Sequence, residues 1–231
     1  MKESIYTIPI NEVFGRLDGC PMCSLERGLE SASLEYVMGA AMMEPDVRVK
    51  TNEQGFCAAH LGKMLAMNNR LSLSLLLESR LMEVEKALFA RGGKMAPVEC
   101  DAKKLKEATA RATSSCFVCA RIEGFMAHCN ENAIFMWNTE SEFRARLEAQ
   151  PFFCIRHCDM LLGRAIKLLR KKELAGFAGA MARLCGAYAG ALREDVSAFC
   201  KSFDYRNAGA EISAAASSSA ERAAAFLAPS T

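Results

Sequence analysis

The sequence of 231 residues has no uninterrupted apolar stretch approaching the roughly 18 residues that a membrane-spanning helix requires. Its first residues, Met1 to Tyr6, also lack the apolar run and small-residue cleavage site of a secretory leader. These absences predict a cytoplasmic protein without a membrane span. Because thiols stay reduced in the cytoplasm, the 11 cysteines indicate metal ligands or redox groups rather than structural disulfides.

An excess of charge of either sign is also lacking, since 29 Lys and Arg face 27 Asp and Glu. Six metal-bound thiolates and two divalent ions would change the formal charge of +2 to zero. A neutral chain without a concentrated basic stripe argues against nucleic-acid binding, which depends on neutralising phosphates. We interpret the one local basic cluster as a solvated helix face; it consists of Arg164, Lys167, Arg170, Lys171 and Lys172.

Histidine is scarce, yet two of the 3 histidines belong to a motif that occurs twice. Each copy has a C-x2-C pair followed, after 33 or 34 residues, by a C-x2-H pair. Two thiolates with a Cys/His pair form the ligand set that tetrahedral zinc prefers. We therefore predict two zinc ions per chain, one held by Cys20, Cys23, Cys57 and His60 and the other by Cys116, Cys119, Cys154 and His157.

The positions of these pairs predict how each site is built. A C-x2-C pair directly precedes a predicted helix, and a C-x2-H pair falls on the first turn of another, where residues three apart share one face. Each site is therefore expected to join two helix N-termini, whose positive partial charge stabilises thiolates. Crossed pairing, in which Cys20 and Cys23 share a metal with Cys154 and His157, remains open. We interpret the other cysteines as packing residues (Cys100, Cys129, Cys158, Cys185 and Cys200), and His128 as a hydrogen-bonded or exposed side chain.

Hydrophobic periodicity predicts an all-α fold of two pseudo-repeated helical halves, each with its metal site, and a long C-terminal helix. The expected halves span residues 1–101 and 102–206, followed by an Ala/Ser-rich tail with a short helix over 207–231. Residues 1–19 are expected to be partly extended and 46–55 to form a polar loop. Helices are predicted over 24–43, 57–90, 102–113, 119–137 and from 155 onward.

Two apolar stripes fit one face of a helix. The first runs from Leu73 to Leu88, and the second from Leu174 to Phe199. The second spans about seven turns, long enough to pack across both halves or against a second chain. Core packing within the chain is the default interpretation of this stripe, and a protein partner or a homo-oligomer is also expected.

Together the two Cys/His motifs, the segment from Pro45 to His60 and the Phe203-Asp204-Tyr205-Arg206-Asn207 motif resemble an uncharacterised bacterial family, a domain of unknown function. The resemblance covers nearly the whole chain. It supports the metal assignment and implies no activity.

Three functions remain as hypotheses. The leading one is a zinc-structured helical interaction or regulatory module of unknown pathway, because four protein ligands leave no open metal position for catalysis. An iron–sulfur or thiol-redox protein is the second, since the same thiolates bind clusters and C-x2-C pairs form disulfides. The third is an enzyme that uses a cleft between the two halves, for which no catalytic residue is assigned. The residues expected to line this cleft are Arg48, Asn52, Asp204, Tyr205 and Arg206.

Overall fold

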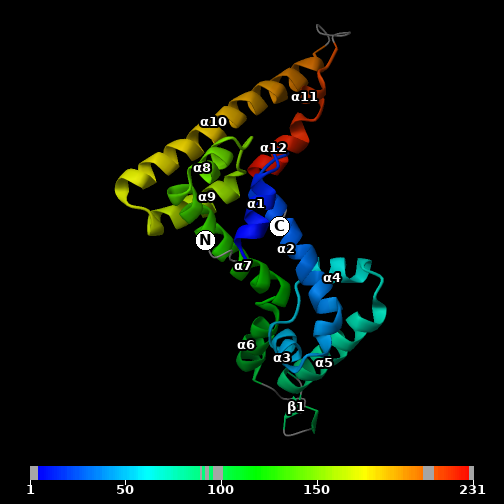
Figure 1. Ribbon diagram of the computed structural model, residues 1–231. Helices are drawn as coiled ribbons and strands as arrows, with labels where there is room; N and C mark the ends of the chain where they lie inside the picture. Colours follow the sequence, from blue (N-terminus) through cyan, green and yellow to red (C-terminus); the bar gives the residue numbers. More distant parts are fainter. Residues whose placement is uncertain (1–4, 89, 92–93, 96–100, 205–210, 229–231) are drawn as a thin grey trace. The chain divides into compact units, whose positions relative to one another are not determined.

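A computed structural model describes residues 5–88, 90–91, 94–95, 101–204 and 211–228 (Figure 1). The regular elements of this part of the chain are helices, except for two short antiparallel strands, β1 (Ala90–Arg91) and β2 (Lys94–Met95). The prediction of an all-α fold is confirmed. No helix among the described residues is long and apolar enough to cross a membrane.

Short connections join most of the helices. Their bounds are α1 Thr7–Phe14, α2 Pro21–Met38, the 3-10 helix η1 Ala40–Met43, α3 Pro45–Gln54, α4 Ala58–Ala66, α5 Arg70–Leu88, α6 Ala102–Thr113, α7 Phe117–Thr139, α8 Ser141–Glu148, α9 Ile155–Leu168, α10 Lys171–Ser202, α11 Ala214–Ser217 and α12 Ser219–Leu227.

Contacts divide the chain into two compact units. Unit 1 combines Met1–Arg27 with Met126–Thr231, and unit 2 is Gly28–Phe125. The division falls inside α2 and α7, so each of these helices contributes to both units. The sequence repeat follows the order of motifs along the chain, whereas the units follow contacts.

In unit 1, α10 runs for 32 residues and packs against α8, α9, α11 and α12. The predicted stripe faces these neighbours, with Phe177, Met181 and Leu192 buried. Phe177 meets the edge of the Trp137 ring at a centroid distance of 5.0 Å. The stripe of α10 is therefore used for packing within the chain. Between residues 155 and 202 the helical structure is interrupted at Leu169 and Arg170, which are extended between α9 and α10.

In unit 1, Thr7–Phe14 form a helix, α1, so the prediction of a partly extended segment over residues 1–19 is wrong for these eight residues. Pro9 is the third residue of α1, where the missing N–H has no intrahelical partner to lose. Phe14 is 1% exposed and packs on Phe143 of α8 at 4.9 Å between ring centroids. Gln150 donates a hydrogen bond to the Phe14 carbonyl at 2.9 Å. Burial of one face thus decides the conformation of this segment.

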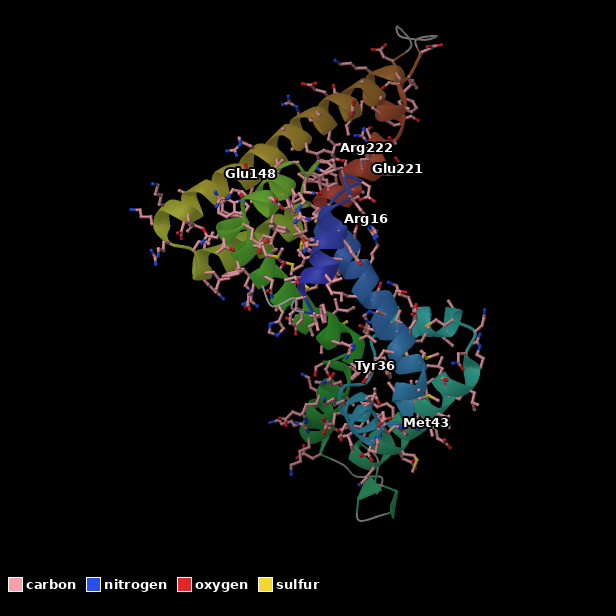
Figure 2. The ribbon with its side chains drawn as sticks, in the orientation of Figure 1. Arg16, Tyr36, Met43, Glu148, Glu221 and Arg222 are labelled. Atoms are coloured by element: carbon pink, nitrogen blue, oxygen red, sulfur yellow. The ribbon has the colours of Figure 1, made fainter. Side chains whose placement is uncertain are left out.

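The C-terminal helix α12 docks on α9 and α10, as expected for the short tail helix. Phe226 is 3% exposed and lies 5.3 Å from the Tyr188 ring. Arg222, labelled in Figure 2, pairs with Asp195 of α10 at 2.7 Å. One aromatic anchor and one ion pair therefore hold α12 in place.

In unit 2 the expected polar loop over 46–55 is a helix, α3, so that prediction is wrong. Pro45 occupies the first helical position, which suits its fixed φ, and Asp46 lies in the first turn. The helix buries only Val47 and Thr51. Hydrogen bonds to α5 compensate for this small apolar face, since Arg48 donates to the Leu75 carbonyl at 2.5 Å.

The single helix predicted over 57–90 is divided into α4 and α5. The break lies at Asn68, whose φ of 58° is left-handed, a conformation that asparagine tolerates better than most residues. The side chain of Asn69 then accepts a hydrogen bond from the Ser72 N–H at 3.3 Å, which caps the start of α5. Leu73 is buried, but Leu81 is 64% exposed, so the predicted stripe is core only in its first turns.

Candidate metal centres

The eight predicted ligand residues fall into two groups, and in each group the four ligand atoms lie within 4.8 Å of one another. Site 1, in unit 1, consists of Cys20, Cys23, Cys154 and His157. Site 2, in unit 2, consists of Cys57, His60, Cys116 and Cys119. The two Cys3His groups are confirmed, but the expected pairing within each half is wrong. Each C-x2-C pair is completed by the C-x2-H pair of the other half.

Helix lengths explain the crossed pairing. The 18 residues of α2 carry the chain about 27 Å from the first C-x2-C pair. The 10 residues of α3 return it by only about 15 Å, whereas an extended loop of that length covers about 33 Å. In the second half the 23 residues of α7 span about 35 Å and the 8 residues of α8 about 12 Å. In each half the helix that follows the long helix is therefore too short to bring the C-x2-H pair back to the C-x2-C pair of the same half.

Within unit 2, two hydrogen bonds hold the segment before Cys57 against the segment that contains Cys116. The Phe117 N–H donates to the Gly55 carbonyl at 2.9 Å, and the Ser115 hydroxyl donates to the Gln54 carbonyl at 3.0 Å. Gly55 has a φ of 62°, and a Cβ there would lie 3.1 Å from the Arg80 side chain. The glycine therefore permits the turn that leads into site 2.

Each site joins two helix N-termini, as predicted. In site 1, Cys20 directly precedes α2 and Cys154 is the N-cap residue of α9. In site 2, Cys116 directly precedes α7 and Cys57 is the N-cap residue of α4. Unpaired N–H groups and the positive ends of both helices therefore point toward the thiols.

The spacing of the ligand atoms matches a single tetrahedral ion. A zinc tetrahedron with bonds of about 2.3 Å to sulfur and 2.0 Å to nitrogen has S–N edges of about 3.5 Å and S–S edges of about 3.8 Å. In site 1 the His157 Nδ1 lies 3.7 Å from Cys20 Sγ, 3.3 Å from Cys23 Sγ and 3.1 Å from Cys154 Sγ. The Cys23 and Cys154 sulfurs are 3.6 Å apart.

Site 2 has the same arrangement. The His60 Nδ1 lies 3.2 Å from Cys57 Sγ, 3.3 Å from Cys116 Sγ and 3.4 Å from Cys119 Sγ. The Cys57 and Cys119 sulfurs are 3.9 Å apart. The two sites differ in exposure, because Cys154 and His157 of site 1 are 0% exposed, whereas Cys119 of site 2 is an exposed residue.

The second ring nitrogen of each histidine faces a glutamate that sequence reasoning missed. Glu30 lies 3.0 Å from His60 Nε2, and Glu26 lies 3.3 Å from His157 Nε2. Each glutamate also binds a cation, Lys63 at 2.6 Å and Arg156 at 2.6 Å. A carboxylate behind a ligating histidine fixes its tautomer and orientation and raises its basicity, and metal-binding histidines almost always have such a partner.

The protonation pattern of site 1 indicates how the metal-free ligands share protons. Hydrogen bonds from Cys20 and Cys23 hold the pKa of Cys154 far below its usual value. Burial lowers the pKa of His157, but Cys154, Cys20 and Glu26 outweigh it and raise that pKa to about 11. Both shifts favour a thiolate on Cys154 beside a protonated His157 in site 1 without metal. An incoming cation replaces the imidazolium proton, so its binding competes with protons.

In site 2 the pKa values of the two most exposed thiols, Cys57 and Cys119, are shifted in opposite directions. Burial opposes ionisation of Cys57, but hydrogen bonds from the His60 N–H and from the Cys116 and Cys119 thiols lower its pKa. Burial and the neighbouring Cys116 raise the pKa of Cys119 to about 12. The metal-free group thus favours its negative charge on Cys57, at the N-terminus of α4.

The other cysteines among the described residues and His128 lie outside both sites. Cys129 is fully buried, as expected for a packing residue, but Cys200 is exposed, so the packing interpretation is wrong there. Burial, with Cys185 nearby, raises the pKa of Cys158 to about 12. His128 is exposed, and its ring contacts that of Tyr6 in a tilted arrangement at 4.9 Å between ring centroids, which agrees with its expected role. Cys100 lies outside the described residues.

The residues named for an enzymatic cleft are engaged in packing or lie elsewhere. Arg48 bonds to α5, and the Asn52 side chain accepts a hydrogen bond from Ser79 at 2.6 Å. Asp204 follows the end of α10 in unit 1. Tyr205 and Arg206 lie outside the described residues.

The fold and the two groups define a helical protein with two candidate Cys3His metal sites, each joining two helix N-termini. A family profile matches residues 1–230, and the chain belongs to DUF6062, a family of unknown function. No curated protein and no solved structure matches the chain.

Proposed function

We propose that each Cys3His site holds one zinc ion and that both ions are structural. The observation that carries this proposal is the surroundings of each histidine. Its Nδ1 faces three sulfurs, while its Nε2 faces a carboxylate that is itself held by Arg156 or Lys63. An ordinary buried cysteine cluster has no need of this outer carboxylate, whereas a zinc-bound imidazole does.

The distances favour one ion per site over an iron–sulfur cluster. In a four-iron cluster each ligand binds a different iron, and in a two-iron cluster the four ligands are divided between two irons, so sulfurs on different irons are separated by the width of the cluster. Here all four ligand atoms of a site lie within 4.8 Å of one another. Three thiolates and one imidazole at tetrahedral spacing are a set that zinc prefers.

A structural role is supported by the complete ligand set. Four protein ligands leave no position for water or substrate, which a catalytic zinc keeps open. Two cavities in unit 1, of about 290 and 360 Å³, have none of the eight ligand residues in their walls. We infer that zinc fixes pairs of helix starts and that the chain is an interaction or regulatory module. A cytoplasmic location is part of this proposal, because thiols stay reduced there.

Metal content and X-ray absorption test this proposal on protein purified under anaerobic conditions without added metal. We expect two zinc ions per chain and a zinc edge spectrum fitted by three sulfurs at about 2.3 Å and one nitrogen at about 2.0 Å. A brown protein that contains iron and inorganic sulfide would overturn the zinc assignment. An oxygen ligand from water in place of one sulfur would instead indicate an open site and overturn the structural role.

A further inference from the structure

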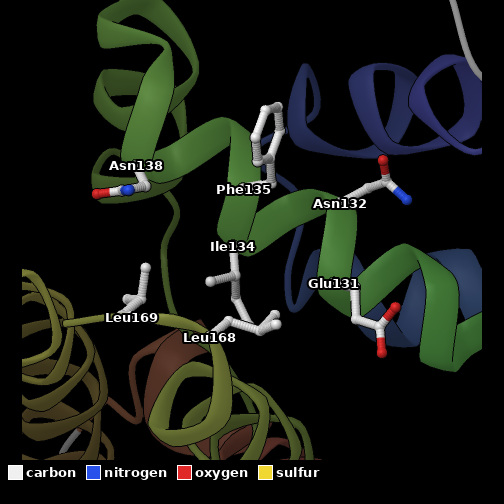
Figure 3. Close-up of a pocket in the computed structure, with 7 residues that line it drawn as sticks. All are labelled: Glu131, Asn132, Ile134, Phe135, Asn138, Leu168 and Leu169. Atoms are coloured by element: carbon white, nitrogen blue, oxygen red, sulfur yellow. The ribbon is translucent and has the colours of Figure 1, made fainter.

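Unit 1 contains a groove between α7 and the connection from α9 to α10, with a volume of about 290 Å³ (Figure 3). One face of α7 forms one wall, and Leu168 and Leu169 form the other. The α7 residues are spaced by three and four positions, the spacing of one helix face. They are Glu131, Asn132, Ile134, Phe135 and Asn138.

The groove has an apolar floor that is open to solvent. Ile134 is fully buried, whereas Phe135 is 62% exposed and Leu168 is 52% exposed. Its volume lies at or below the lower end of the range for small-molecule sites, which is about 300 to 1,000 Å³. The space suits one or two large apolar side chains better than a cofactor.

The chain on both sides of the two leucines is positively charged. Lys167 and Arg170 flank the two leucines, and Lys171 and Lys172 begin α10; all four are exposed, and none forms an ion pair within the described residues. The groove's own acid, Glu131, is paired with Arg164 at 3.1 Å. The Glu173 carboxylate accepts a hydrogen bond from the Arg170 backbone N–H at 3.0 Å. The positive end of the α10 dipole adds to this potential.

We propose that this groove binds a short acidic segment of a partner protein that inserts one or two large apolar side chains between α7 and Leu168. The apolar floor selects the anchor, and the four unpaired cations attract flanking Asp or Glu residues. The side-chain amide of Asn138 has no hydrogen-bond partner within the described residues and is placed to bond to the bound backbone. This inference deepens the proposed role as an interaction module.

The shape of the groove argues against the two other anionic partners. A membrane surface is bound by a helix with one broad apolar face, whereas the apolar residues of this groove are interrupted by Glu131, Asn132 and Asn138. Single-stranded nucleic acid is bound through aromatic platforms, and the groove offers one aromatic ring, Phe135.

The test is a selection of phage-displayed random peptides on the zinc-analysed full chain, followed by fluorescence anisotropy with the enriched peptides. We expect sequences with a Leu, Ile or Phe anchor and neighbouring acidic residues. The double variant Lys171→Glu with Lys172→Glu should weaken their binding about tenfold, since it replaces two attractions by repulsions. Acidic residues in the first turn of α10 are compatible with the helix dipole, so the fold should be retained. Phe135→Ala should weaken binding by a similar factor.

A matched control is Lys103→Glu with Lys106→Glu, which makes the same charge change on exposed positions of α6 and should alter binding less than twofold. Peptides without acidic residues, equal loss in both double variants, or no enrichment would overturn the proposal. So would binding to phosphatidylserine vesicles, or self-association in analytical ultracentrifugation, that is lost in Phe135→Ala. Zinc content measured on the same samples separates the two proposals. Two zinc ions without peptide binding would overturn only the proposal of a peptide-binding groove. Peptide binding by a folded, zinc-free chain would overturn only the proposal of structural zinc.

Discussion

Replacing Glu26 by glutamine should weaken zinc binding at site 1 and leave site 2 unchanged. The carboxylate faces His157 Nε2 at 3.3 Å and binds Arg156 through two contacts of 2.6 Å. Glutamine keeps the shape but removes the negative charge that supports the imidazole. Loss of such an outer partner lowers metal affinity by about 10- to 100-fold, which is about 1.4 to 2.8 kcal/mol.

The assay is competition with a chromophoric zinc chelator, in which the two sites release metal as separate phases. Glu30→Gln provides the converse variant, since Glu30 faces His60 at 3.0 Å and should affect site 2 alone. Glu107→Gln makes the same charge change at an exposed position on α6 and should affect neither. If Glu26→Gln released zinc from site 2, or no more than Glu107→Gln did, the outer-carboxylate argument would be refuted.

The pH dependence of the same variant follows from the pKa of Glu26. Burial raises this pKa, but His157 and Arg156 outweigh it and lower the pKa from 4.5 to about 2. A lowered folded-state pKa stabilises the fold above about pH 4.5, and that contribution is lost as the pH falls through about 2. Glu26 thus stays charged while the thiolates take up protons, and without its charge site 1 should release zinc at a higher pH than in the wild type.

Three further predictions follow. Crossed pairing predicts that Cys20→Ser and Cys154→Ser each remove the same zinc ion and, when combined, still leave one zinc per chain, measured by elemental analysis; loss of both ions from the double variant would support pairing within each half. Because Cys119 is exposed whereas Cys154 is 0% exposed, peroxide should oxidise site 2 and release its zinc several-fold faster than it releases the zinc of site 1. A zinc dye follows the release, and the Cys57→Ser variant identifies which kinetic phase belongs to site 2. Equal rates of release from the two sites would count against this prediction. Asn68→Ala should lower the free energy of unfolding by about 1 kcal/mol and Asn68→Gly should not, because φ is 58° at this position. Denaturant titration measures both variants, and equal free energies of unfolding would show that the left-handed turn is absent.

The eight ligands could be predicted from the sequence because their geometry is local. Cys57 and His60 lie on one helical turn, as do Cys154 and His157, so residue type and spacing place both ligand atoms of a pair on one side. The pairing of the pairs is not local. It depends on α3 being a helix instead of an extended loop, and α3 buries only Val47 and Thr51. Its stability comes from bonds to α5, a segment that follows later in the chain.

Helix α1 could not be predicted from the sequence for a related reason. Pro9 and the glycines near it are signals of irregular structure, and α1 has only eight residues, too few to be stable alone. The packing of Phe14 on Phe143 and the hydrogen bond from Gln150 stabilise α1, and both partners are more than a hundred residues away. Contacts at this separation leave no pattern within the segment itself.

The two outer glutamates show where a stronger sequence argument was available. A ligating histidine needs a carboxylate, carbonyl or water on its second nitrogen, so a Cys3His motif implies a search for an acidic residue near each histidine. Glu26 and Glu30 stand three and seven residues after Cys23, which places both on the face of α2 that also carries this ligand. One of them faces the histidine of each site. Periodicity therefore identifies the acidic residues on the ligand face of α2, while only the crossed pairing decides that Glu26 serves His157 and Glu30 serves His60.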